Sequence, residues 1–274
     1  MKKTALFLTL CLCILVLFGC RNNEAEAGQY LYATGLTYSG EDDPKAYLEI
    51  AGRSQELLAL LEEKAGAFVM NAYNFQDGDG EGTPLYEMNQ MDLPIEIDPA
   101  GYCVSVDKNY LDLHGIMTAE GSPAGDSLII DDRTQNILVP EKYRDREQDI
   151  LREYRAAFYF EKVTAENSYN EDAGLPERLG LTEEDLTVNI IYVKDGQSYP
   201  VYREDIVCEN GCITDPVVQV YTGNIHCNYA HSDLSQWTYF YSDREDPGEA
   251  YETIRPYIEQ CGASESLQSV KHVG

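Results

Sequence analysis

The sequence predicts an α+β protein in which a mixed sheet, or more than one sheet, packs against two to three helices. Apolar residues recur at helical spacing over residues 44–65 and 141–163. Shorter runs, rich in Val, Ile and Tyr, alternate apolar and polar residues as strands with one buried face do. Because helices and strands do not alternate strictly along the chain, a doubly wound parallel sheet is not expected.

The two long helices have recognisable starts. Asp43 and Pro44 form an N-cap followed by proline at the first helical position, and Gly66 ends that helical pattern. Pro140 precedes the second helix, which turns apolar residues between positions 150 and 158 to one side and charged residues to the other. A solvated outer face explains those charges without any function.

Strands are expected wherever the alternating runs occur. The strongest short-range signal is Asp195-Gly196, a dipeptide typical of two-residue hairpins, between the runs 186–193 and 198–202. The other expected strands are 67–75, 102–111, 128–130, 136–140, 217–222 and 237–241.

Two further segments affect the domain organisation. Residues 164–185 are polar and are expected to be mostly loop, and they are the one place where the domain could divide. Asp246 and Pro247 start a C-terminal helix, which Pro256 is expected to kink or end because proline has no backbone N–H to donate.

The N-terminus predicts export and lipid attachment. Residues 5–18 are apolar but too few to cross a bilayer as a helix, which needs roughly twenty residues. Leu17 to Cys20 then resembles a lipobox, so we expect residues 1–19 to be removed and Cys20 to carry diacylglycerol. Residues 20–29 would be a tether, residues 30–265 an extracytoplasmic domain at the cell membrane, and residues 266–274 a C-terminal tail. The alternative is an uncleaved N-terminal anchor helix.

The charge of the chain restricts its partners. The net charge is −28 at pH 7, and removal of residues 1–19 leaves 18 basic against 48 acidic residues. Such a surface repels nucleic-acid phosphates and anionic lipids, so no nucleic-acid partner is expected. A cationic peptide, a cationic protein face or divalent cations fit the field, although solubility alone also explains it.

One group of residues has the spacing of a zinc site. Cys208, Cys212, His226 and His231 follow C-x3-C-x13-H-x4-H, with Cys227 as an alternative ligand. The segment around the two histidines has little helical character, which argues against a zinc finger. A local disulfide between Cys208 and Cys212, in an exported protein, and unligated side chains are the alternatives. No cofactor other than this zinc is expected.

A second candidate metal motif is weaker. Asp77, Asp79 and Glu81 alternate in a glycine-rich loop like the start of a calcium loop. The twelfth position, where an EF-hand needs Glu, is Met88. The chain also lacks a G-x-S-x-G elbow and the common phosphate-binding glycine motifs, so no catalytic residues are predicted.

Several segments together resemble a known family. They are VDKNYLDLHGI (106–116), QNILVPEKYRDREQDILREY (135–154), IIYVKDGQSYPVY (190–202) and ITDPVVQVYT (213–222). Their order and spacing are similar to those in the extracellular region of bacteriocin-associated integral membrane proteins of Gram-positive bacteria, permease-like subunits of ABC transporters. Unlike those proteins, this chain ends at residue 274 without further apolar segments of membrane-spanning length.

This resemblance implies a lipid-anchored binding or accessory module, with an ABC transporter permease or a cationic peptide as partner, in peptide immunity or export. It implies no catalytic residues. The alternatives are an extracellular hydrolase acting on envelope glycans, since carboxylates are abundant, and a truncated permease fragment without activity.

Overall fold

The chain folds around one large sheet, and the computed structural model describes residues 28–273 except 41 and 89–93. Cys20 and residues 1–19 therefore lie outside the described residues. Eight strands form the large sheet in the order β10-β1-β9-β2-β3-β8-β4-β5, and β6 pairs with β7 in a small one. The strands are β1 (Tyr30–Thr34), β2 (Phe68–Asn71), β3 (Cys103–Val106), β4 (Thr134–Pro140), β5 (Thr187–Val193), β6 (Ser198–Pro200), β7 (Cys212–Thr214), β8 (Val217–Val220), β9 (Thr238–Ser242) and β10 (Val270–His272).

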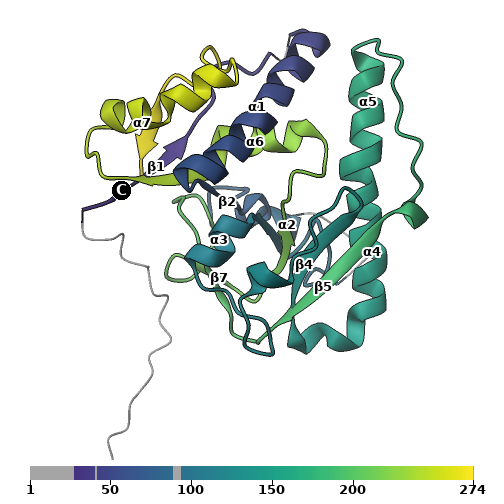
Figure 1. Ribbon diagram of the computed structural model, residues 1–274. Helices are drawn as coiled ribbons and strands as arrows, with labels where there is room; N and C mark the ends of the chain where they lie inside the picture. The colour runs from purple at the N-terminus through teal and green to yellow at the C-terminus, as the bar shows by residue number, and fades with distance from the viewer. Residues whose placement is uncertain (1–27, 41, 89–93, 274) are drawn as a thin grey trace, which may run out of the picture.

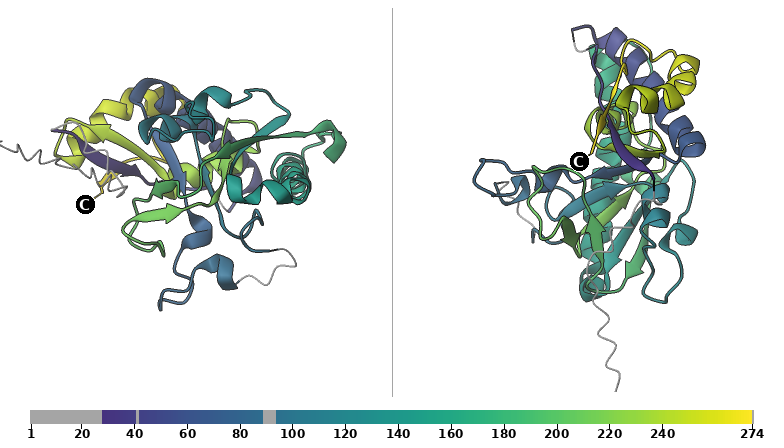
Figure 2. Two further views of the ribbon diagram at one scale, coloured as in Figure 1. Left: turned by 90° about the horizontal axis from the view of Figure 1, so that it is seen from below. Right: turned by 90° about the vertical axis from the view of Figure 1, so that its left-hand side faces the viewer.

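Helices surround this sheet, which confirms the predicted α+β class (Figure 1). They are more numerous than the two or three expected. Their bounds are α1 (Pro44–Ala65), α2 (Leu85–Met88), α3 (Lys108–Leu113), α4 (Glu147–Tyr159), α5 (Ala165–Asp172), α6 (Cys227–Gln236) and α7 (Pro247–Gln260). The segment that contains α2 projects from the body of the molecule (Figure 2).

The large sheet has an antiparallel half and a mixed half. The strands from β10 to β3 are joined by antiparallel pairs. The next pair, β3 with β8, is parallel, β8 with β4 is antiparallel, and β4 with β5 is parallel. Strands that precede residues 164–185 in the sequence and strands that follow them belong to the same large sheet, so this segment does not separate two sheets.

Helix α1 forms as the sequence predicts. The Asp43 carboxylate accepts a hydrogen bond from the backbone N–H of Lys45, which satisfies one of the free donors at the first turn. Gly66 ends the helix in the left-handed conformation, with φ of 62°, and its N–H donates to the carbonyl of Leu61. One face of α1, including Leu57, Leu58 and Leu61, is fully buried.

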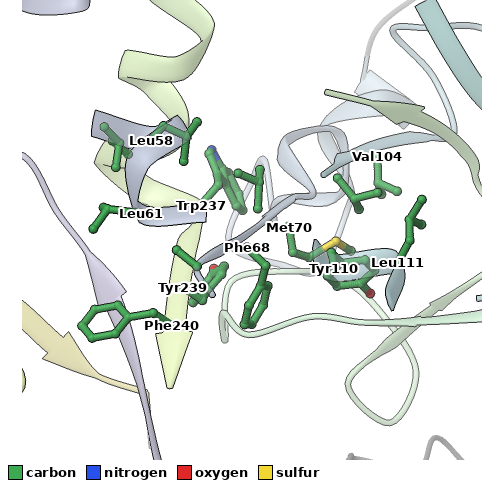
Figure 3. Close-up of a cluster of buried hydrophobic side chains, with 14 of the residues drawn as sticks. Leu58, Leu61, Phe68, Met70, Val104, Tyr110, Leu111, Trp237, Tyr239 and Phe240 are labelled. Atoms are coloured by element: carbon green, nitrogen blue, oxygen red, sulfur yellow. The ribbon is translucent and has the colours of Figure 1, made fainter. Parts of the chain in front are cut away.

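The main core lies where α1, α6 and α7 cover the antiparallel half of the sheet. Figure 3 shows Leu58 and Leu61 of α1 in one cluster with Trp237, and the strand residues Tyr239 and Phe68 lie side by side below Trp237 in this view. A second core forms between α4 and the mixed half, where Ile150 and Tyr154 pack against Ile137, Val139 and Val217.

Residues 141–172 form one continuous helical column with changing pitch. It begins as a 3-10 helix over Glu141–Arg146, continues as α4, passes through a π-helical segment, Phe160–Thr164, and ends as α5. Figure 1 shows α4 and α5 stacked in line beside β4 and β5. The expectation that residues 164–185 are mostly loop is wrong for the first third of that segment.

Other local expectations were wrong because tertiary pairing overrode them. The turn at Asp195-Gly196 does not join a hairpin, since β5 pairs with β4 and β6 pairs with β7. Residues 128–130 form no strand. Pro256 lies inside α7 without ending it. The expected C-terminal tail contributes β10, which pairs with β1.

Among residues 28–273, apart from the gaps at 41 and 89–93, no helix is long and apolar enough to cross a membrane.

Leu58→Ala should lower the free energy of unfolding by about 3 kcal/mol, because Leu58 is fully buried between α1 and the sheet and its removal leaves a cavity. Urea denaturation followed by tryptophan fluorescence measures this change. Ile130→Ala is the matched control, since Ile130 is 66% exposed, and it should change the free energy by no more than about 0.5 kcal/mol. Equal effects of the two substitutions would contradict the packing described for α1.

Candidate ligand-binding site

The structure does not assemble the predicted zinc site. Cys208 and Cys212 belong to the region of the small sheet, whereas His226 caps α6 and His231 lies inside α6, which packs on α1. Within the described part of the chain, no three side chains of His, Cys, Asp or Glu are grouped so that they could hold a metal ion. The zinc prediction is wrong because the spacing was matched without the fold, and Cys227 does not complete the set.

The two histidines instead join helices. The His226 ring stacks on Tyr169 of α5, with ring centroids 4.7 Å apart, and Tyr169 stacks in turn on Tyr47 of α1. His231 Nδ1 lies 2.9 Å from the Ser54 hydroxyl of α1 and packs edge-on against Tyr47. The segment 224–231 around the two histidines was expected to have little helical character, but residues from Cys227 onward form α6, whose N-terminus His226 caps by accepting from the N–H of Asn228.

The predicted local disulfide is also absent. Cys208 carries a free thiol, and burial raises its pKa.

In the calcium-like loop, the carboxylates accept hydrogen bonds from the backbone of the loop itself. Asp77 Oδ1 accepts from the N–H of Gly80 at 2.8 Å, and Asp79 Oδ1 accepts from the N–H of Glu81 at 2.8 Å. These carboxylates therefore stabilise the turn by binding backbone donors.

A polar cavity of about 200 Å³ lies on the mixed half of the sheet. Asn71 of β2 is opposite Ser105 of β3, and Ser105 is opposite Gln219 of β8. Register partners in neighbouring strands share a face, so these three side chains form a polar row across the sheet. Gln135 of β4 adds a fourth polar side chain, and all four line the cavity.

The same strands are apolar one pleat away on this face. Cys103, Val217 and Ile137 pack under α4 in the second core. Two residues further along β3 and β8 the side chains become Ser105 and Gln219. Each strand therefore changes from apolar to polar where α4 gives way to the π-helical segment, and the cavity opens there.

Glu161 from the π-helical segment faces this polar row. Its carboxylate accepts hydrogen bonds from the amide groups of Gln135 and Gln219, both at 3.4 Å. Burial raises the pKa of Glu161 to about 7, because desolvation disfavours the charged form. Single π turns within α-helices occur frequently at functional sites. The α4 residues that pack on the neighbouring part of β3, β4 and β8 are apolar, and Glu161 is where the column presents a carboxyl group to the polar row.

Asp233 closes the cavity from the side of α6. Together with Tyr229 and Ser232 it lies on one face of the helix, at i, i+3 and i+4 spacing. Asp233 is buried and its Oδ1 accepts from the Asn71 amide at 2.9 Å. Burial, with a smaller contribution from the charge of Asp107, raises the pKa of Asp233 to about 7.

The cavity contains acids and amides but no basic side chain. None of the described residues that line it is Lys, Arg or His. Lys162 follows Glu161 directly, yet its ammonium group is held by Asp132 at 2.7 Å and by the Asn224 carbonyl at 2.8 Å. Gln135 is buried, and its Oε1 atom has no hydrogen-bond partner among the residues that the structure describes.

Glu62 and Asp107, two further buried acids, lie close to each other behind the cavity. Burial, followed by the charge and hydrogen bond of Asp107, raises the pKa of Glu62 to about 9. Asp107 caps α3 by accepting from the N–H of Tyr110, and burial raises its pKa as well. The unpartnered atoms Glu62 Oε1 and Asp107 Oδ2 are both satisfied if Glu62 keeps its proton at neutral pH.

A second, more open cavity of about 490 Å³ lies between the segment 75–87 and the small sheet. The aromatic rings of Phe75, Tyr86 and Tyr102 line it and contact one another. This cavity is more open, whereas two carboxyl groups with raised pKa values line the polar cavity, so we take the polar cavity as the candidate site.

No family model, curated protein or solved structure matches this chain. The site therefore rests on geometry alone. Sequence reasoning missed Glu161 and Asp233, because an acid in a charged helix, or in a chain with 48 acids, carries no local signal. The polar residues inside otherwise apolar strands, Ser105 and Gln219, were the one signal that could have indicated it.

The free energy of unfolding should fall as the pH rises from 5 to 9. Folded Glu62 holds its proton to about pH 9, whereas the unfolded chain loses it near its ordinary pKa of 4.5, so unfolding releases a proton within this window. In Glu62→Gln the decline should be smaller by up to about 1.4 kcal/mol per pH unit. Urea denaturation at pH 5, 7 and 9 measures the slope.

Glu63→Gln is the matched control for this change, because its carboxylate is 67% exposed and pairs with Lys64. This variant should keep the wild-type slope. If Glu62→Gln also keeps it, Glu62 does not hold a proton in the folded protein.

Proposed function

We propose that this chain is a lipid-anchored extracytoplasmic binding module that captures a small polar ligand in the cavity. The observation that carries the proposal is the convergence of amide, hydroxyl and carboxyl groups from β2, β3, β4, β8, α6 and the π-helical segment on one cavity of about 200 Å³. Binding sites for small molecules are typically concave, with a few polar groups that fix the ligand. Polar groups placed in an otherwise apolar sheet cost stability, so a ligand explains their position better than folding does.

The partner in this proposal is a transporter. The resemblance to the extracellular region of bacteriocin-associated permeases supports a role beside an ABC transporter permease, in immunity or export of a peptide. A net charge of −28 supports encounter with cationic partners, because complementary charge accelerates association. The acidic surface also supports a function that does not involve nucleic acid.

A hydrolase is the second candidate, because Glu161 and Asp233 line one cavity and both have raised pKa values near 7. Paired carboxyls of this kind serve as acid and base in glycosidases. Both carboxyls, however, already accept side-chain amides, which suits holding a ligand. We therefore favour binding without turnover.

Lipid attachment is tested at Cys20. In a Gram-positive host the wild-type chain should fractionate with membranes, and its mass should equal residues 20–274 plus a diacylglycerol, with or without a further acyl chain. Cys20→Ala should lose the lipid mass, because only the thiol can form the thioether. Intact-mass spectrometry measures this, and Cys227→Ala is the control, since Cys227 is a half-buried thiol at the start of α6. Residues 1–19 retained without a lipid would contradict the anchor.

Ligand binding is tested by adding small compounds to the wild type and to a variant whose cavity a larger side chain occupies. Thermal unfolding is measured with cationic (putrescine, arginine amide), neutral (glucose, N-acetylglucosamine) and anionic (succinate) compounds, and the mixtures are analysed for products. At least one class should raise the melting temperature of the wild type, and Ser105→Leu should abolish the shift because its side chain occupies the cavity. Ser264→Leu, at an exposed position, should keep it.

Two results would count against a binding module. If no compound stabilises the protein, or Ser105→Leu leaves every shift unchanged, the cavity is not the site. If products form and disappear in Glu161→Gln, the hydrolase is favoured.

A further inference from the structure

We propose that the ligand of this cavity is a small organic cation, an ammonium or guanidinium compound, that binds between Glu161 and Asp233. This inference rests on the proposed function and adds the chemical class of the ligand. It is carried by three observations: the two carboxyls, the absence of basic side chains among the described lining residues, and an unpartnered acceptor in the wall.

The carboxyls are not compensated by protein charge. Among the described residues, the donors to the Glu161 carboxylate are the neutral amides of Gln135 and Gln219, at the long distance of 3.4 Å. Asp233 accepts from the neutral amide of Asn71. A buried carboxylate normally pairs with a cation, because an amide recovers only part of the lost hydration. An anionic ligand would add a third negative charge, so it is disfavoured.

The acceptor pattern requires a ligand with several N–H groups. Gln135 Oε1 is buried without a donor, which costs free energy in the empty protein. Its amide nitrogen already donates to Glu161, so the oxygen is the end that remains for a ligand. An ammonium group has three donors and a guanidinium group has five, and neither accepts. Either group can therefore donate to both carboxylates, and also to this oxygen once the Gln135 side chain rotates toward the cavity, because the oxygen has almost no accessible surface in the empty protein.

A metal ion fits the cavity less well. The described residues contain no group of three His, Cys, Asp or Glu side chains placed to hold a metal. The volume of about 200 Å³ exceeds that of a bare ion and suits a small molecule.

Binding of a cation should be coupled to proton release. The cation stabilises ionised carboxylates, and burial has raised the pKa of Glu161 and of Asp233 to about 7. Affinity should therefore be weak below pH 7, rise through it and level off above it. For each carboxyl that must ionise, the affinity falls about tenfold per pH unit below pH 7.

Most neighbouring titratable groups stay neutral in this range, whereas Asp107, whose pKa burial raises to about 7, ionises within it and contributes to the dependence. Burial raises the pKa of the phenols and of the thiol around the cavity above the working range, so they stay neutral, while Glu62 keeps its proton and Asp107 titrates with its own raised pKa. These groups are Tyr154 of α4, Tyr229 of α6, Tyr221 after β8, Cys103 of β3, Glu62 of α1 and Asp107 before α3.

The test is calorimetric titration of the full-length chain, purified from a Gram-positive host as that host processes it. Putrescine and arginine amide are the cationic probes, glucose is the neutral probe and calcium chloride is the metal probe. At least one cationic probe should bind at pH 8, with a dissociation constant at least about tenfold larger at pH 6. In Glu161→Gln the binding at pH 8 should fall at least tenfold, and in Glu171→Gln, an exposed carboxylate of α5, it should not change.

A stability readout shows that the loss is not caused by unfolding. Glu161→Gln removes a carboxylate that is desolvated in the folded state, so its melting temperature at pH 8 should equal or exceed that of the wild type. Lower melting temperature together with lost binding would assign Glu161 a structural role and overturn the inference.

The remaining outcomes separate the inference from the proposed function. If glucose binds to the wild type, loses its binding in Ser105→Leu, and neither cationic probe binds, the proposal of a binding module stands. The inference that the ligand is a cation is then wrong. If calcium alone binds, the site is a metal site and the inference is overturned. If no probe binds at either pH, and the compounds tested above also fail, both proposals fall.

Discussion

The parallel pairing of β3 with β8 is the constraint on which both the core and the cavity depend. In this register Ser105 lies beside Gln219 on one face, while Val104 and Val218 lie together on the other. Side chains alternate between faces with a period of two, so a slip of one residue would place Gln219 in the main core and a valine in the cavity. The apolar residues fix the register, because burying the valines excludes the slipped pairing. The polar row is therefore positioned by the hydrophobic core of the opposite face.

The helical column beside the sheet adds the charged wall. Ile150 and Tyr154 anchor α4 on the apolar part of β4 and β8, and the π-helical segment follows at the level where the strands become polar. The wider turn holds Lys162 toward Asp132 while Glu161 turns to the sheet. Neighbouring residues of opposite charge thus point to different surroundings, and Glu161 is left without the cation next to it in sequence. A protein that buries uncompensated acids in this way gives up stability at that position, as functional sites commonly do.

The sequence determined α1 but could not reveal the site. Asp43, Pro44 and Gly66 act within a few residues of each other, so their capping chemistry can be read from the sequence. Helix α6 and the π-helical segment are stabilised by partners far along the chain: His231 contacts Ser54, and the N–H of His226 donates to the carbonyl of Glu161. The same non-local pairing explains why Asp195-Gly196 did not make a hairpin, since β5 found a parallel partner in β4. The zinc prediction failed for a related reason: it used the spacing of the four residues along the sequence, and the fold does not bring them together.

Two electrostatic scales act on a cation that approaches this protein. The surface acids, most of them solvated, create a field that ions screen within about 10 Å at 0.1 M salt. That field raises the local concentration of any cation but cannot select one, because hydrated charges bind weakly. Asp233 and Glu161 are desolvated, so salt screens them less, and a dissolved cation can bind them once it enters the cavity and replaces water as a donor. In the proposed site selection then depends on geometry, since the ligand must donate to two carboxylates within about 200 Å³. The strongly acidic composition read from the sequence therefore accounts for attraction, while recognition depends on a few acids that composition cannot distinguish from the rest.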